Sequence, residues 1–273
     1  MRSAAIRLLK RRAHPLFMVA RRLRDDFTHP RLIEPDASDR VLVLAPHMDD
    51  EAIGCGGAVL RHRQLGSPLA VTYLTDGAEG DARLADPSIS SAEATRLRRA
   101  LRGERRLEAE AWCAAAGAER VDFLDLPDGR LAAHAHAHAD GQAVQRLADI
   151  IVAWQPSVVY LPSPLDAHPD HRAANRLALA ALRRASPRNA AMRLRGYEVW
   201  TPVLPNAVMD ISSVVDAKAR LLGLHASQLR DIDYGRHIAG LNAYRAILLP
   251  GRAGHAEAFV DLALERYADL LAD

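Results

Sequence analysis

Short apolar runs alternate with longer helical patterns along most of this chain. The runs predict strands at residues 41–45, 69–74, 121–124, 158–161 and 197–200. The first run, Val41-Leu42-Val43-Leu44-Ala45, is apolar at every position, as expected for a strand that is covered on both faces. Between the strands, the spacing of apolar residues predicts helices at 58–64, 92–116, 144–154 and 172–184.

The order of these elements predicts the class of fold. Strand, helix and strand in succession favour right-handed crossovers and a mainly parallel sheet. We therefore expect an α/β, Rossmann-like fold with helices flanking the sheet and a smaller helical C-terminal region from about Asp216 onward. We treat residues 39–273 as a single domain and residues 1–38 as a basic N-terminal extension.

Polar, turn-rich segments follow four of the predicted strands directly. They lie at residues 46–51, 75–79, 126–129 and 163–168. In a sheet of this kind the ligand binds beyond the carboxyl ends of the strands. We therefore expect the four segments to converge at one rim of the sheet and to hold the functional site.

The segment after the first strand concentrates side chains that bind metals. His47 and Asp50 lie three residues apart, so one turn at the start of a helix aims both at a single point. Imidazole and carboxylate groups are suitable ligands for Zn²⁺. Asp49, Asp50 and Glu51 also concentrate negative charge, which a bound cation would offset. The alternative is a solvated acidic helix N-terminus, where carboxylates are stabilising without a metal.

A second cluster, His168-Pro169-Asp170-His171, follows the fourth predicted strand. Taken alone, this cluster has two interpretations. Its two histidines supply one metal ligand and one free imidazole, or the segment is a surface turn. The two clusters together are more informative, because a catalytic zinc takes three protein ligands and one water. His47, Asp50 and His171 supply that number of ligands, which leaves Asp49 and His168 for proton transfer.

Both clusters stand in longer motifs. Ala45-Pro46-His47-Met48-Asp49-Asp50-Glu51 is followed by Gly54-Cys55-Gly56-Gly57, and the second cluster continues into Arg172. These segments resemble the two motifs of the PIG-L/LmbE family of zinc N-deacetylases, and the resemblance extends from about Arg40 to Phe259. Two residues depart from the family pattern. Met48 replaces the usual proline, and Asp166 stands where some members have a mobile tyrosine.

The resemblance implies a role for each matching residue. The ligands of one zinc ion per chain are implied to be His47, Asp50 and His171. The implied catalytic groups are Asp49 as the general base, His168 as the group that stabilises the oxyanion, and Asp170 as the acid that orients His168. The residues implied to contact the sugar are Glu79, Arg105 and Asp128.

We therefore expect a zinc-dependent hydrolase that removes an N-acetyl group from an N-acetylglucosamine-type conjugate and releases acetate and a free amine. Either Asp49 or His168 protonates the leaving amine. The alternatives are an amidase that cuts a larger acyl group from an amino sugar and a catalytically silent sugar-binding module on the same fold. The run Gly54-Cys55-Gly56-Gly57 has two interpretations. It is either the nucleotide-binding loop of a methyltransferase, which is a further alternative function, or a set of glycines that permits tight packing of the metal loop.

Composition changes this interpretation little. A net charge of +2 gives no reason to expect a nucleic-acid partner, so we expect a small-molecule or glycoconjugate substrate. Cys55 and Cys113 form no disulfide framework, which favours a reducing cytoplasm, and Cys55 is expected to be a small buried residue. Tyr197 and Trp200 are expected in the core, with stacking on a sugar at the rim as the alternative.

Two segments stay open to more than one interpretation. Basic and apolar residues alternate over the first 26 residues, which form either a helix packed on its own domain or an amphipathic helix at the inner face of a membrane. His134, His136 and His138 alternate with alanines and form either a surface loop or a second metal site.

Overall fold

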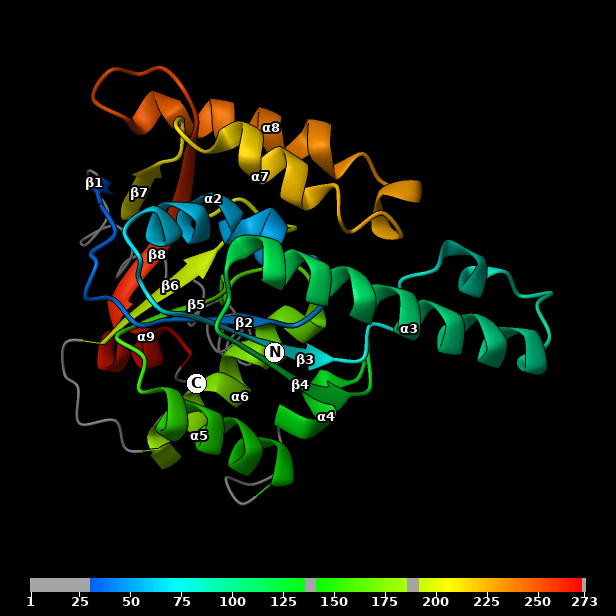
Figure 1. The fold of residues 1–273 in the computed structure, drawn as a ribbon. Coiled ribbons are helices and arrows are strands. Elements are labelled where there is room, and N and C mark those ends of the chain that lie inside the picture. Colours follow the sequence, from blue (N-terminus) through cyan, green and yellow to red (C-terminus); the bar gives the residue numbers. More distant parts are fainter. Residues whose placement is uncertain (1–29, 136–140, 186–191, 272–273) are drawn as a thin grey trace, which may run out of the picture.

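The structure, a computed structural model, describes residues 30–135, 141–185 and 192–271. These residues form an eight-stranded sheet in the order β1-β7-β8-β6-β5-β2-β3-β4, with helices on both faces (Figure 1). The strands are β1 (Arg31–Leu32), β2 (Val41–Ala45), β3 (Leu69–Thr75), β4 (Arg120–Leu126), β5 (Val158–Pro162), β6 (Arg193–Tyr197), β7 (Ala207–Asp210) and β8 (Ala256–Ala263). The predicted α/β class is confirmed.

Most of the sheet is parallel, as predicted. The strands β4, β3, β2, β5 and β6 all run parallel to one another. The strand β8 runs antiparallel to both β6 and β7, and the short edge strand β1 runs parallel to β7. The sheet is therefore mixed on the side that the C-terminal part of the chain builds.

The helices form one layer on each face of the sheet. One layer contains α2 (Asp50–Gln64), α3 (Ser91–Ala116), α7 (Val215–Leu222) and α8 (Tyr234–Arg245), and the other contains α4 (Leu131–Ala135), α5 (Gln142–Trp154), α6 (Pro169–Ala185) and α9 (Leu264–Leu270) (Figure 1). Three short 3₁₀ turns complete the described elements, η1 (Ala82–Ala85), η2 (Gln228–Arg230) and η3 (Ala246–Leu248). The helix α3 ends at Gly117 in the left-handed conformation, with φ 80°, where glycine carries no Cβ penalty.

The strand β2 lies inside the sheet, between β5 and β3, and this position accounts for its apolar sequence. Leu42 and Leu44 pack in the core beneath α5 and α6, whereas Val41, Val43 and Ala45 pack in the core beneath α2 and α3. All five side chains are fully buried. A strand between two helical layers has no solvent-facing side, so alternation of polar and apolar residues is absent.

The C-terminal region differs from the helical region that the sequence predicts. It contains α7, α8 and α9, but it also contributes β8, which inserts between β6 and β7. Seven of the eight β8 positions are buried, so the strand belongs to the core of the sheet. The fifth predicted strand, at 197–200, is also misplaced, because Arg193 and Arg195 belong to β6 and interrupt the apolar run that the prediction required.

The helix α2 begins at Asp50, directly after the metal-binding cluster, rather than at residue 58. Its first turns have no apolar periodicity because glycines occupy them. Gly54 leaves space for the ring of Tyr197, since a Cβ at that position would lie 2.1 Å from the Tyr197 Cδ2 atom. The helix is kinked at Cys55, where φ is −142° and ψ is 16°.

A buried ion pair from the C-terminal region supplies hydrogen-bond partners for backbone groups at the kink of α2. The N–H groups of Gly57 and Ala58 donate to the carboxylate of Glu257 at 2.7 and 2.8 Å. Lys218 contacts the same carboxylate at 2.7 Å and donates to the carbonyl of Ile53 at 3.0 Å. The ion pair therefore satisfies backbone groups that a kink would otherwise leave unpaired in the interior.

Most of the predicted N-terminal extension lies outside the described residues. Within the described part, Arg31 and Leu32 form β1 and so add to the sheet ahead of the boundary placed after residue 38. No helix in residues 30–135, 141–185 or 192–271 is long and apolar enough to cross a membrane. His136 and His138 lie outside the described residues, as does the side chain of His134.

Candidate active site

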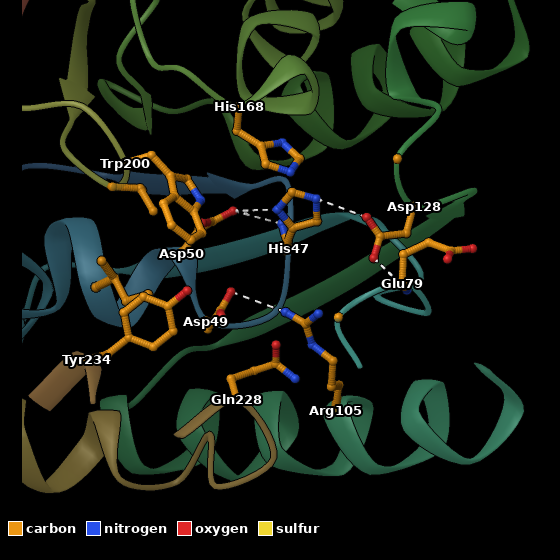
Figure 2. Close-up of a pocket in the computed structure, with 14 residues that line it drawn as sticks. His47, Asp49, Asp50, Glu79, Arg105, Asp128, His168, Trp200, Gln228 and Tyr234 are labelled. Carbon is orange, nitrogen blue, oxygen red and sulfur yellow. Dashed lines mark hydrogen bonds and ion pairs between the residues drawn. The ribbon is translucent and has the colours of Figure 1, made fainter. Parts of the chain in front are cut away.

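The segments after β2, β3, β4 and β5 meet at the carboxyl edge of the sheet, as predicted. They surround a pocket of about 180 Å³, in which His168, Asp50 and Asp128 lie around His47 (Figure 2). The predicted site residues that line this pocket are His47, Asp49, Asp50, Glu79, Arg105, Asp128 and His168. The two remaining predicted residues, Asp170 and His171, are fully buried behind its wall.

The three predicted ligand atoms form a compact triangle. His47 Nδ1 lies 3.3 Å from Asp50 Oδ2, His171 Nε2 lies 3.2 Å from the same oxygen, and the two nitrogens lie 3.3 Å apart. Zinc ligands at about 2.0–2.2 Å in a tetrahedral arrangement lie about 3.3–3.5 Å from one another. The triangle therefore fits a single metal ion of that size, with a fourth position left open towards the pocket.

Two other groups of side chains also bring ligand atoms within 4.8 Å of one another. They are His47 with His168 and His171, and His47 with Asp128 and Asp170. Both share His47 with the triangle above, and the second uses its opposite nitrogen. His47 Nε2 lies 3.1 Å from Asp128 Oδ1 and 3.4 Å from Asp170 Oδ2, so the second group has distances similar to those of the Asp50 triangle.

A carboxylate lies behind each histidine of the triangle. His47 Nε2 is 3.1 Å from Asp128 Oδ1 and 3.4 Å from Asp170 Oδ2, and His171 Nδ1 is 3.1 Å from Asp166 Oδ1. Carboxylates placed in this way fix the ring orientation and leave the opposite nitrogen free for a metal. Asp166 therefore orients the ring of His171.

These carboxylates also determine the charge of the histidines. Burial lowers the pKa of His47, but the carboxylates of Asp128, Asp170 and Asp50, which accept hydrogen bonds from its ring, outweigh burial and raise that pKa well above its ordinary value. Burial also lowers the pKa of His171, but Asp50 and Asp166 outweigh burial and raise that pKa to about 9. The centre therefore favours positive charge between its carboxylates, and a metal cation would take the place of these protons.

Asp49 lies beside the triangle and does not belong to it. Its Oδ1 accepts a hydrogen bond from Arg105 Nη2 at 3.2 Å, and Arg105 also donates to the backbone carbonyls of Met48 and Gly77 (Figure 2). Burial raises the pKa of Asp49 and the charge of Asp50 adds to this, whereas Arg105 opposes the shift. A buried carboxylate with a raised pKa accepts a proton more readily than an exposed one, which suits a general base.

The contact that orients His168 differs from the prediction. The backbone N–H of Asp170 donates to His168 Nδ1 at 3.2 Å, so the neutral ring carries its proton on Nε2. The Asp170 carboxylate instead accepts from the N–H groups of Gly129 and Leu131 and faces His47. Burial and the two neighbouring histidines lower the pKa of His168, which favours this neutral form.

The residues predicted to contact a sugar also carry structural contacts. Arg105 is only 3% exposed and holds Asp49, as described above. Asp128 Oδ2 accepts from the N–H of Glu79 at 3.0 Å, and the Glu79 carboxylate forms a two-bond ion pair with Arg98. All three line the pocket, but Glu79 is the most accessible to a ligand.

Several pocket residues escaped the sequence analysis. Gln228 and Tyr234 come from η2 and α8, where no motif signals a site. Trp200 is 51% exposed at the pocket edge, which agrees with the alternative position at the rim rather than with the core, whereas Tyr197 is fully buried as predicted. The ring centroids of Trp200 and Tyr234 lie 6.3 Å apart, and the two side chains face the pocket from the side opposite Glu79 (Figure 2).

A second hollow of about 420 Å³ adjoins the first. The two share Glu79, Gly80, Gln228 and Tyr234 in their walls. The additional wall of the second hollow comes from η1 and from the segment before α8, including Asp81 and Asp231. A ligand with one group beside the triangle can therefore extend into the second hollow.

The glycine-rich run serves packing rather than nucleotide binding. A Cβ at Gly57 would lie 2.7 Å from Ile211 and 2.9 Å from the Glu257 carboxylate, so glycine is required for close approach. Cys55 is fully buried, as predicted, and its Sγ contacts the backbone carbonyl of Glu51 at 3.5 Å. Burial raises the pKa of this thiol well above its ordinary value, which disfavours the thiolate form that a metal requires.

Comparison with known proteins agrees with this geometry. The sequence model of PIG-L, described as GlcNAc-PI de-N-acetylase, matches residues 42–182. The diacetylchitobiose deacetylase of Thermococcus kodakarensis is 28% identical over 203 residues, which is 69% of this chain and 70% of that protein. The 1D-myo-inositol 2-acetamido-2-deoxy-alpha-D-glucopyranoside deacetylase of Nocardia farcinica is 30% identical over 270 residues, covering 78% and 88%.

A solved structure shares the fold with a different activity. GalB, the 4-carboxy-2-hydroxymuconate hydratase of Pseudomonas putida KT2440, superposes with a TM-score of 0.64 at 24% identity and covers 81% of this chain and 95% of that one. At this identity the likeness shows the fold alone. The function therefore has to be argued from the side chains of the site.

Proposed function

Because the chain belongs to the PIG-L family of GlcNAc-PI de-N-acetylases, we propose that it is a zinc-dependent hydrolase that deacetylates an N-acetylglucosamine conjugate. The products are acetate and a conjugate with a free amine. The observation that carries the proposal is the triangle of His47 Nδ1, Asp50 Oδ2 and His171 Nε2, with distances of 3.2–3.3 Å and with Asp49 and His168 beside its open side.

The residues of the triangle would hold one zinc ion per chain. When bound, zinc acts as a Lewis acid that polarises an amide carbonyl and lowers the pKa of water towards about 7. Asp128, Asp170 and Asp166 keep the outward nitrogens of the two histidines occupied. This leaves His47 Nδ1 and His171 Nε2 as the ligand atoms.

Asp49 is the proposed general base. It accepts the proton of the attacking water, and Arg105 holds its carboxylate in place during the transfer. General bases positioned in this way typically contribute about 10²–10⁴-fold to the rate. Asp49 is also the first candidate to return the proton to the leaving amine, because the proton is then already bound at the site.

His168 is the proposed donor to the oxyanion. The backbone of Asp170 occupies its Nδ1, so its Nε2–H is the group available to the pocket. A donor of this kind is typically worth about 2.7–4 kcal/mol in the transition state. The neutral ring still donates through this Nε2–H, which fits the lowered pKa of His168.

The adjoining hollow is the proposed position for the rest of the conjugate. Its walls carry the carboxylates of Glu79, Asp81 and Asp231, and no Lys or Arg is among the described residues that line it. Arg98 pairs with Glu79, and Arg83 pairs with Asp81, both from outside the hollow. An anionic group would therefore meet carboxylates, so we propose that the conjugate is neutral at this end, as a second sugar or a polyol is.

A silent sugar-binding module is the main alternative from another class. Sugar binding alone requires neither a buried carboxylate beside a metal triangle nor a histidine with its Nε2–H aimed into the pocket. Within the enzyme class, an amidase for larger acyl groups is the rival. The pocket beside the triangle measures about 180 Å³, which favours a small acyl group over a long one.

The test combines metal content with acetate release from the purified chain. We expect about one zinc per chain and release of acetate from N-acetylglucosamine linked to a neutral sugar or polyol, with both lost after chelation and restored by zinc. An N-acetylglucosamine conjugate with a carboxylate or phosphate on the aglycone should react more slowly. Zinc-loaded protein that binds these conjugates without releasing acetate would support the binding module instead.

A further inference from the structure

Two buried side chains connect the C-terminal region to the loop that carries Asp49. Glu51 and His225 are both fully buried, and Glu51 Oε1 lies 2.7 Å from His225 Nε2. The two residues are 174 positions apart in the sequence. A carboxylate in the interior requires a hydrogen-bonded partner, and His225 supplies it.

The second oxygen of the same carboxylate reaches the proposed base. Glu51 Oε2 accepts a hydrogen bond from the backbone N–H of Asp49 at 3.1 Å. Burial and the neighbouring charge of Glu51 raise the pKa of the Tyr73 hydroxyl, so a further polar group lies near this carboxylate. His225, Glu51 and the Asp49 backbone thus form a chain of two hydrogen bonds that ends at the active site.

The His225 ring makes few other polar contacts. Its Nδ1 is buried and has no hydrogen-bond partner among the described residues. The turn that carries the ring is nevertheless well anchored, because the N–H and hydroxyl of Ser227 donate to the Glu108 carboxylate at 2.7 and 2.6 Å. The ring is therefore held rigidly with its Nε2 towards Glu51, and it does not line the pocket itself.

We propose that His225 is a positioning residue for the general base. By holding the Glu51 carboxylate, it fixes the backbone of Asp49, and so fixes the direction of the Asp49 side chain. Arg105 restrains the Asp49 carboxylate from the other side, so the base is held at both its backbone and its side chain. This inference rests on the proposed function, in which Asp49 takes the proton of water.

The test compares His225→Gln with His225→Asn in the full-length, zinc-loaded protein. The amide nitrogen of Gln occupies the position of the histidine Nε2, whereas that of Asn occupies the position of Nδ1 and does not reach Glu51. We expect His225→Asn to lower kcat by about 10–100-fold, the range seen when a hydrogen-bonded support behind an active-site group is lost. KM and zinc content should stay within about twofold, and His225→Gln should recover most of kcat.

A second measurement reports on the backbone without relying on activity. The Asp49 N–H donates to Glu51 at 3.1 Å and also to the His47 carbonyl at 3.1 Å, so loss of the Glu51 contact should weaken its protection from hydrogen exchange. In His225→Asn its exchange should become about tenfold faster or more, while in His225→Gln it should stay close to that of the unmodified chain. A matched control is His62→Gln, which changes a different fully buried histidine, located in α2 and away from the pocket. This variant should leave both kcat and Asp49 exchange unchanged.

The outcomes separate this inference from the proposed function. If the unmodified chain releases no acetate from any conjugate, the proposed function fails, while the exchange measurement still tests the link to Asp49. Equal losses of kcat in the Asn and Gln variants, in step with thermal stability and with unchanged Asp49 exchange, would assign His225 a structural role and overturn the inference.

Discussion

The two ends of α2 both bury a histidine in a polar cluster, yet the clusters have opposite electrostatics. At the N-terminal end, carboxylates surround the metal triangle and raise the pKa values of His47 and His171. At the C-terminal end, His62 is fully buried between Tyr160 and Ser67, with Nε2 3.1 Å from the Tyr160 hydroxyl and Nδ1 3.4 Å from the Ser67 hydroxyl.

The neighbouring charges account for the difference. Burial, followed by the positive charge of Arg195, lowers the pKa of His62 to about 3. Arg195 approaches because its guanidinium donates to the same Tyr160 hydroxyl at 2.7 Å. Burial of a histidine thus does not make a cation site by itself. Asp39 also lies 3.6 Å from His62, so the balance between carboxylates and cations around the ring decides whether the site attracts or excludes positive charge.

The largest effect is expected from His171→Ala, which removes one of the three ligand atoms. Loss of a group behind a ligand already costs about 10–100-fold in metal affinity, so loss of the ligand itself should exceed about 100-fold. Metal analysis after dialysis measures this. The same change at His62 should leave zinc content unaltered, and full zinc occupancy in His171→Ala would contradict the assignment of the triangle.

The next effect is expected from Asp49→Ala, which should retain zinc and lose about 10²–10⁴-fold in kcat. The side chain lies beside the triangle and contributes none of its three atoms, so metal binding and turnover should separate. Single-turnover acetate release together with metal content tests this. Zinc loss in this variant would mean that Asp49, and not Asp50, is the ligand.

A smaller effect is expected from Asp166→Asn, which replaces the carboxylate behind His171 by a neutral amide. Zinc affinity should fall by about 10–100-fold because the ring loses the negative charge of the carboxylate behind it. Competition with a chromogenic chelator measures the affinity. Asp39→Asn is the matched control, because Asp39 lies 3.6 Å from His62 in the other cluster and should have no effect on zinc.

The last prediction concerns a different quantity, the dependence of the free energy of unfolding on pH. The folded pKa of His62 is about 3 and its ordinary value is 6.5, so between these values the unfolded chain binds a proton that the folded chain does not. Stability should therefore fall by about 1.4 kcal/mol per pH unit as the pH decreases through this window. Urea unfolding of the unmodified chain and of His62→Leu should show a shallower pH slope in the variant. Parallel slopes would mean that His62 is protonated in the folded protein.

The sequence indicated the proposed metal-binding side chains better than the residues that orient them. His47, Asp50 and His171 follow strands that the apolar runs identify, and parallel strands bring their carboxyl ends to one edge. The roles of Asp166 and Glu51 were not predicted, because a carboxylate beside a motif has no spacing that indicates which ring or backbone group it faces. His225 lies 174 residues from its partner, and only the folded chain brings the two together.

The C-terminal part shows the same limit. Its helices were predicted, but β8 was not, since an antiparallel insertion between β6 and β7 depends on the rest of the sheet. Trp200 was placed in the core because aromatic residues after a strand are usually buried, and its exposure at the pocket depends on how the chain continues after β6. Contacts of this kind are set by tertiary structure rather than by local pattern.

The contact between Glu257 and the kink of α2 has a consequence for the order of events during protein synthesis. The metal motif is made early, but Glu257 follows Gly57 by 200 residues, and the two N–H groups at the kink have no such acceptor until it arrives. The first half of the chain can form its parallel strands while translation continues. The helix that carries Asp50 reaches its final form only when nearly the whole chain has left the ribosome, so a nascent chain interrupted before β8 should bind zinc poorly even though it contains all three ligands.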